Sequence, residues 1–121
     1  IVLVGPIAGE YWERCLTIEK EQRPELWVLG ELPVDEIEEI PEKLMSHILD
    51  RGLCIVEEHC RQGGVGQQLS HILLSQGISP KKFMSFHSAG YQNGRSGSQS
   101  FHRRQSGLTV EQVLLVLEQI T

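Results

Sequence analysis

Short apolar runs alternate with amphipathic stretches along almost the whole sequence. Four runs of aliphatic and aromatic residues are bounded by glycine, proline or charged residues, which predicts strands buried in a sheet. The predicted strands are 1–4, 26–29, 53–56 and 82–86. Between them, apolar residues recur every three to four positions, which predicts helices. The predicted helices are about 8–22, 41–50, 65–76 and 110–120, with a further short helix at 99–105.

Local signals mark where two of these helices begin. Asp35 with Glu38 and Thr109 with Gln112 each have the spacing of a capping box, in which two side chains satisfy the free N–H groups of a helix start. Pro41 interrupts the pattern after Asp35, so the segment forms either two shorter helices or a turn before a helix at 41–50.

The order of these elements predicts the fold class. Strands alternate with helices long enough for right-handed crossovers, which is typical of an α/β fold. We therefore expect a three-layer α/β/α domain with a mainly parallel sheet of about four strands. In such sheets function usually lies beyond the carboxyl ends of the strands. That edge would collect residues 5–9, 30–33, 57–66 and the chain from 87 onward.

Length and composition bound the class of protein. The chain has 121 residues, 40% of them hydrophobic, which fits one domain over 1–121. No apolar run approaches the roughly 20 residues that cross a bilayer, so we expect a soluble protein. The sequence opens on Ile1 without a signal-like stretch, and we expect a domain excised from a longer chain.

Charge and cysteine content narrow the class further. The formal net charge of −5 argues against a general nucleic-acid binder. Residues 1–59 hold 14 acidic and 5 basic side chains, whereas 60–121 hold 2 acidic and 6 basic ones. This asymmetry reflects either two differently solvated faces or surfaces that meet different neighbours. Cys15, Cys54 and Cys60 are too few and odd in number for a disulfide framework, which favours free thiols in the cytoplasm.

The segment 56–66 is the richest in candidate chemistry. A strand, a glycine turn and a helix start could cradle an anion, although neither the dinucleotide nor the P-loop glycine pattern is present. The other interpretation is that Gly63 and Gly64 serve the backbone, through positive φ angles and close packing of helix on sheet. Glu57 and Glu58 are adjacent at a strand end and point to opposite sides, so they cannot act as paired carboxylates. We expect at least one of them at an interface.

Other candidate groups carry weaker signals. His59 and Cys60 are sequence neighbours, which rarely have the geometry of a catalytic thiol–imidazole pair. The histidines at 47, 59, 71, 87 and 102 lack the usual zinc-binding spacings. Trp12 and Trp27 are expected to be core or interface aromatics.

Three groups of residues, in order along nearly the whole chain, are similar to those of a known family. Pro33-Val34-Asp35 follows the second strand, Val56-Glu57-Glu58-His59 with Gly63-Gly64 and Gly66 follows the third, and Gly97-Ser98 with Ser106-Gly107-Leu108 precedes the last helix. This pattern resembles the C-terminal domain of the transketolase family of thiamin-diphosphate enzymes. The Glu-Glu-His form is most similar to transketolase and deoxyxylulose-phosphate synthase.

The resemblance implies a role in assembly. In this family, thiamin diphosphate and its divalent metal, here expected to be Mg, are held by the two preceding domains, while the third packs against them and supports the dimer. It therefore implies a structural domain of an enzyme of two-carbon ketol or acyl transfer, without catalytic, cofactor or metal residues of its own. The implied partners are the pyrimidine-binding domain of the same enzyme and the dimer mate. The implied interface residues are Glu57, Glu58, His59, Gly63 and Gly64.

Departures from the family pattern leave a second hypothesis open. The family's small-residue helix start is replaced at 5–9, its Pro-Asp after the fourth strand is replaced at 88–91, and its extra antiparallel edge strand would precede Ile1. The alternative is a stand-alone binding module that takes an anionic metabolite at the Gly63–Gly66 helix start. Under the assembly hypothesis, Glu58 and His59 should be exposed to water in the chain alone or take part in its self-association.

Overall fold

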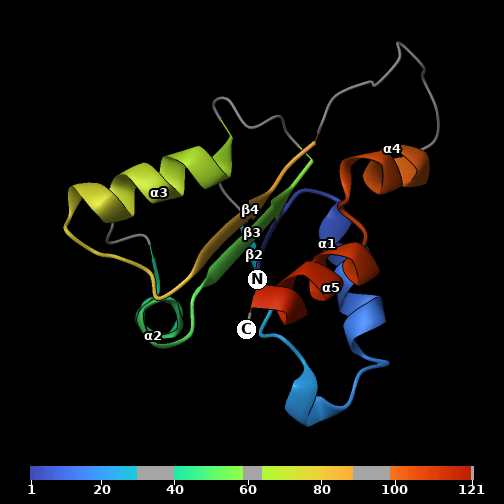
Figure 1. Cartoon of the computed structure of the whole chain (residues 1–121), viewed down its shortest axis with the longest axis horizontal. Helices are drawn as coiled ribbons and strands as arrows, with labels where there is room; N and C mark the ends of the chain where they lie inside the picture. Colours follow the sequence, from blue (N-terminus) through green and yellow to red (C-terminus); the bar gives the residue numbers. More distant parts are fainter. Residues whose placement is uncertain (30–39, 59–63, 89–98, 121) are drawn as a thin grey trace.

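The computed structural model describes residues 1–29, 40–58, 64–88 and 99–120, with only the backbone given for 99–102 and 119–120 (Figure 1). All four predicted strands and all five predicted helices are present. In chain order the elements are β1 (Val2–Val4), α1 (Ile7–Cys15), the 3₁₀ turn η1 (Lys20–Gln22), β2 (Trp27–Leu29), α2 (Glu42–Asp50), β3 (Leu53–Glu57), α3 (Val65–Ser75), β4 (Phe83–Phe86), α4 (Gln99–Ser106) and α5 (Val110–Ile120).

The strands form one parallel sheet in the order β2-β1-β3-β4. Val2 of β1 pairs with Trp27 on one side and with Ile55 on the other. The chain thus winds outward from β1 to β2 and then outward in the opposite direction from β3 to β4. The strand order reverses between β1 and β3, and in doubly wound sheets ligands bind beyond the carboxyl ends at this switch point.

Helices cover both faces of the sheet, which confirms the predicted α/β/α layers. Helices α2 and α3 lie on one side, and α1 and α5 lie on the other (Figure 1). Because successive side chains of a strand point to opposite faces, Val2 and Ile55 enter the core under α2 and α3, whereas Leu3 and Val56 enter the core under α1 and α5. Every residue of β3 is buried, as expected for a central strand with helices on both faces.

Helix α1 ends at Cys15, so the predicted continuation to about residue 22 is wrong. Three local contacts explain the early end. The Thr17 hydroxyl donates to the Arg14 carbonyl at 2.7 Å. The Arg23 guanidinium donates to the carbonyls of Leu16 and Ile18. The Thr17 bond satisfies a carbonyl of the last helical turn, and the Arg23 bonds satisfy two carbonyls just after the helix, so the chain can turn away at this point.

The structure confirms the predicted capping box at the start of α5. The Thr109 hydroxyl accepts the Gln112 N–H, and the Gln112 side-chain oxygen accepts the Thr109 N–H at 3.1 Å, as a capping box requires. Helix α2 begins directly after Pro41, which both alternatives predict, and the choice between them depends on residues 30–39, which lie outside the described residues. The pair at 35 and 38 lies outside the described residues. Within the described ranges, no helix is long and apolar enough to cross a membrane.

Candidate functional site

The last residue of β3 is a buried acid that caps a helix of its own chain. Glu57 is 1% exposed. Its carboxylate accepts the N–H of Val65 at 2.7 Å and the N–H of Gly66 at 3.2 Å, at the start of α3. Gly64, the residue before the helix, has no side chain that could do this. A carboxylate at this place satisfies free N–H groups and complements the positive end of the helix dipole.

The Glu57 cap occupies the N–H groups that the predicted anion site would use. An anion at the start of α3 would need the N–H groups of Val65 and Gly66, which already bind Glu57. The negative charge of Glu57 would also repel it. The described part of the Gly63–Gly66 segment is therefore a self-capped helix start and offers an anion no free N–H at these two residues.

The glycines of this segment have different roles from those expected. Gly64 has φ −78° and ψ 173°, which any residue can adopt, so the expected positive φ at this position is wrong. Close packing of helix on sheet is confirmed at Gly66, because a Cβ there would overlap Ser85 Oγ and lie 3.3 Å from Ser85 Cβ. Of the two described glycines in this segment, Gly64 and Gly66, close packing therefore requires glycine at Gly66.

Glu58 points to the opposite side of the sheet edge from Glu57, as the alternation of side chains predicts. There it accepts a hydrogen bond from Arg103 Nη2 of α4 at 2.9 Å, while Arg103 Nη1 donates to Glu10 of α1 at 3.0 Å. The Arg103 side chain is 11% exposed, and the two carboxylate side chains are 24% and 31% exposed. The hydrogen bond with Glu58 raises the pKa of Arg103 above its ordinary value, against the effect of burial.

A second set of contacts fixes the start of α5 against α1. The buried Tyr11 hydroxyl donates to the Leu108 carbonyl at 2.7 Å. Burial raises the pKa of Tyr11 well above its ordinary value, so the phenol stays neutral and donates this bond. Arg14 pairs with Glu111 at 3.3 Å across an exposed surface. An open hollow of about 500 Å³ lies beside these contacts, between α1, α4 and α5.

The predicted site residues therefore separate into three groups. Glu57, Gly64 and Gly66 are buried within the chain, where β3 and β4 meet the start of α3. Glu58 is partly buried in an ion pair with Arg103 of its own chain, and its place at an interface stays a prediction. His59 and Gly63 lie outside the described residues. Sequence analysis missed Arg103 and Glu10, and no short motif could have revealed them, since they lie 45 and 48 residues from Glu58.

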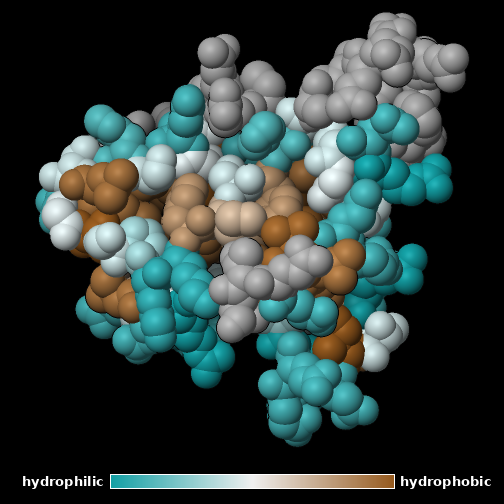
Figure 2. Space-filling model, in the orientation of Figure 1, coloured by the Kyte–Doolittle hydropathy of each residue, from teal (hydrophilic) through white to brown (hydrophobic). Residues whose placement is uncertain are grey.

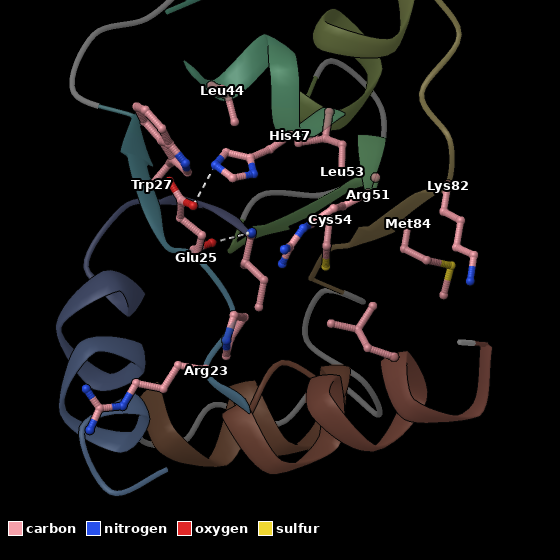
Figure 3. Close-up of a pocket in the computed structure, with 14 residues that line it drawn as sticks. Arg23, Glu25, Trp27, Leu44, His47, Arg51, Leu53, Cys54, Lys82 and Met84 are labelled. Carbon is pink, nitrogen blue, oxygen red and sulfur yellow. Dashed lines mark hydrogen bonds and ion pairs between the residues drawn. The ribbon is translucent and has the colours of Figure 1, made fainter. Parts of the chain in front are cut away.

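A pocket at the opposite, amino-terminal edge of the sheet was also missed. It has a volume of about 280 Å³ and lies between α2, α5 and the first residues of the strands (Figure 3). Its walls are mostly apolar, and Arg51 and Lys82 line it. Ile1 lies in its wall. Arg23, although it lines the pocket, turns its guanidinium toward the end of α1.

Two polar features stand out in this pocket. His47 Nε2 lies 2.6 Å from Glu25 Oε2, and Lys43 lies 3.6 Å from the other carboxylate oxygen. Trp27 Nε1 is buried and has no hydrogen-bond partner among the described residues. Cys54 also lines the pocket, and its burial raises the pKa of the thiol to about 12, so it remains protonated and a poor nucleophile.

The other described side chains add no metal centre. Among residues 1–29, 40–58, 64–88 and 99–120, no three histidine, cysteine or acidic side chains are grouped as metal ligands would be. Cys15 and Cys54 are free, buried thiols.

Comparisons with protein-family models, with curated proteins and with solved structures found no match for this chain.

Proposed function

We propose that this chain is a structural and assembly domain of a thiamin-diphosphate-dependent enzyme of the transketolase type. In this proposal it packs against a pyrimidine-binding domain, supports the dimer and works in the cytoplasm. The parent reaction is the transfer of a two-carbon ketol or acyl group. The chain itself contributes no reacting group.

The proposal is supported by the way two of the family-like motifs meet at one place. Glu58 belongs to the motif after β3, and Leu108 belongs to the motif before α5. Arg103 binds Glu58, and Tyr11 binds the Leu108 carbonyl, so both motifs are tied to α1. Glu58 and Leu108, which lie 50 positions apart in the sequence, are therefore both held against α1 at one edge of the sheet. Such an arrangement suits a docking surface better than a reaction centre.

The cofactor does not fit the described residues of this edge. A diphosphate needs free N–H groups or cationic side chains, often with Mg²⁺. The N–H groups of Val65 and Gly66 bind Glu57, and the Arg103 guanidinium binds two carboxylates. The proposal accordingly assigns thiamin diphosphate and Mg to the partner domains.

Association is the direct test. The chain is mixed with the two cofactor-binding domains of a transketolase-type enzyme from the same genome, and complex formation is measured by size-exclusion chromatography with light scattering. We expect a complex that His59→Ala weakens and His71→Ala, at an exposed position of α3, leaves unchanged. Titration of the chain alone with thiamin diphosphate and Mg²⁺ should give no heat in calorimetry.

Two results would contradict the proposal. One is micromolar binding of thiamin diphosphate by the chain alone. The other is a gene in which neither the preceding sequence nor a neighbour encodes a pyrimidine-binding domain.

A second candidate function is the binding of a small apolar carboxylate in the amino-edge pocket. The buried, unpartnered N–H of Trp27 favours it, since a ligand oxygen could accept that hydrogen bond. Arg51 and Lys82 would attract the negative charge. The test is quenching of Trp27 fluorescence by phenylacetate in a Trp12→Phe background. Absence of saturation up to millimolar phenylacetate would dismiss this candidate.

A further inference from the structure

Among the described side chains of helix α4, Arg103 is the one that forms ion pairs with two other elements. Of its described side chains, residues 103–106, Arg104 and Gln105 are exposed, and none is a buried apolar group. Hydrophilic surface also dominates the end of the molecule where α4 lies (Figure 2). Arg103, at 11% exposure, is the exception. The described contacts that anchor α4 include the two ion pairs of Arg103, the hydrogen bond that Gln112 Nε2 donates to the Arg104 carbonyl at 3.1 Å, and the buried Leu108 that follows the helix.

Arg103 connects two elements on either side of the switch point. Glu10 lies on α1, which follows β1, and Glu58 follows β3. The two nitrogens of one guanidinium each bind a different carboxylate, at 3.0 and 2.9 Å. A planar guanidinium can hold both partners at once, whereas an ammonium acts as a point charge and fits this geometry poorly.

Two further features favour movement of α4: a donor on Arg103 that is unsatisfied within the described part of the chain and a glycine between α4 and α5. Arg103 Nε is buried and has no hydrogen-bond partner among the described residues, which weakens the docked state. Gly107, between α4 and α5, has φ +74°, a conformation that other residues rarely adopt. Thr109 and Gln112 cap α5 directly after it through bonds to each other. Gln112 Nε2 also donates to the Arg104 carbonyl of α4, so undocking of α4 breaks that bond but leaves the cap of α5 in place.

We propose that Arg103 is a latch and that α4 is a strap over the switch-point edge of the sheet. When Arg103 leaves Glu10 and Glu58, α4 undocks as a unit about Gly107 while the sheet stays folded. Undocking exposes two carboxylates at the edge where doubly wound proteins bind ligands. This inference does not depend on the proposed function.

Hydrogen exchange of backbone amides tests the latch. In Arg103→Met, which keeps most of the side-chain length but not the charge, we expect amides of residues 103–108 to exchange roughly tenfold faster or more, because charge-assisted hydrogen bonds are lost. Amides of β1 and β3 should keep their protection. Arg103→Lys should fall between Arg103→Met and the wild type. Arg104→Met is the matched control, since Arg104 is exposed, and should leave all rates unchanged.

A salt titration of the wild-type chain keeps the test valid if Arg103→Met does not fold. Raising NaCl to about 1 M shortens the screening length to roughly 3 Å, so exchange in 103–108 should rise while β1 and β3 stay protected. Two outcomes would overturn the latch. In one, neither the variant nor salt changes exchange in 103–108. In the other, exchange rises equally in 103–108 and in the sheet, which would make Arg103 an inseparable part of the global fold.

Discussion

Removing the charge of Glu57 tests whether its carboxylate stabilises the start of α3 at the carboxyl edge of the sheet. Glu57→Gln keeps the shape of the side chain but replaces the carboxylate by an amide. One oxygen can still accept the Val65 N–H, now at 2.7 Å from Glu57 Oε2. The amide NH₂ then faces the Gly66 N–H, whose present acceptor is Glu57 Oε1 at 3.2 Å. Two donors would point at each other in a buried site.

The magnitude follows from three contributions. Loss of charge weakens the bond to Val65 by about 1 kcal/mol, and an unsatisfied buried N–H at Gly66 costs about 1 to 3 kcal/mol. Loss of a charge at the helix start costs about 0.3 to 1 kcal/mol. Relief from burying a charge offsets part of this sum. We expect a net loss of about 2 kcal/mol, which for a domain of this size lowers Tm by roughly 8 °C.

Urea unfolding followed by circular dichroism measures this loss, with Glu13→Gln as the matched control at an exposed position of α1. Amide exchange should also rise at Val65 and Gly66 before it rises in β1. An unchanged urea midpoint for Glu57→Gln would show that the carboxylate contributes nothing as a cap. A loss equal to that of Glu13→Gln would lead to the same conclusion.

Three further predictions follow from packing and burial. Gly66→Ala should lower the free energy of unfolding in urea by about 1 to 3 kcal/mol, because its Cβ would overlap Ser85 Oγ. Adding Ser85→Ala to this variant should restore part of the loss. Gly9 has open space around it, so Gly9→Ala should instead raise the free energy of unfolding by roughly 0.5 to 1 kcal/mol. Tyr11→Phe should cost about 1 to 2 kcal/mol through its lost buried hydrogen bond. The pKa of Cys54 is raised to about 12 in the folded chain. The contribution of this protonated thiol to stability is therefore fully present below the unfolded thiol pKa of about 8.5 and falls as pH rises toward 12. The urea midpoint of the wild type should decline between about pH 8 and 10, and the midpoint of Cys54→Ala should decline less.

Much of the fold is determined by the sequence alone. The run 53–56 is apolar at every position, which is typical of a strand with helices on both faces, and β3 is such a strand. The alternation of strands and helices leads to a parallel sheet because each helix returns the chain to the same end of the sheet, so that successive strands run in one direction. Thr109 and Gln112 lie three residues apart, so their reciprocal bonds need no distant partner. These features depend on neighbours in sequence, and the pattern therefore reveals them.

The contacts within the candidate site depend on the tertiary structure. Sequence shows that Glu57 and Glu58 point to opposite sides, but it cannot show that Glu57 meets α3 or that Glu58 meets Arg103, 45 residues away. The end of α1 likewise depends on Arg23, which reaches back to the carbonyls of Leu16 and Ile18 just after the helix. Hydrophobic periodicity reports burial against a layer, whereas an ion pair or a cap depends on which two segments the folded sheet brings to one edge. That pairing is set by the strand order β2-β1-β3-β4, which no local stretch of the sequence encodes.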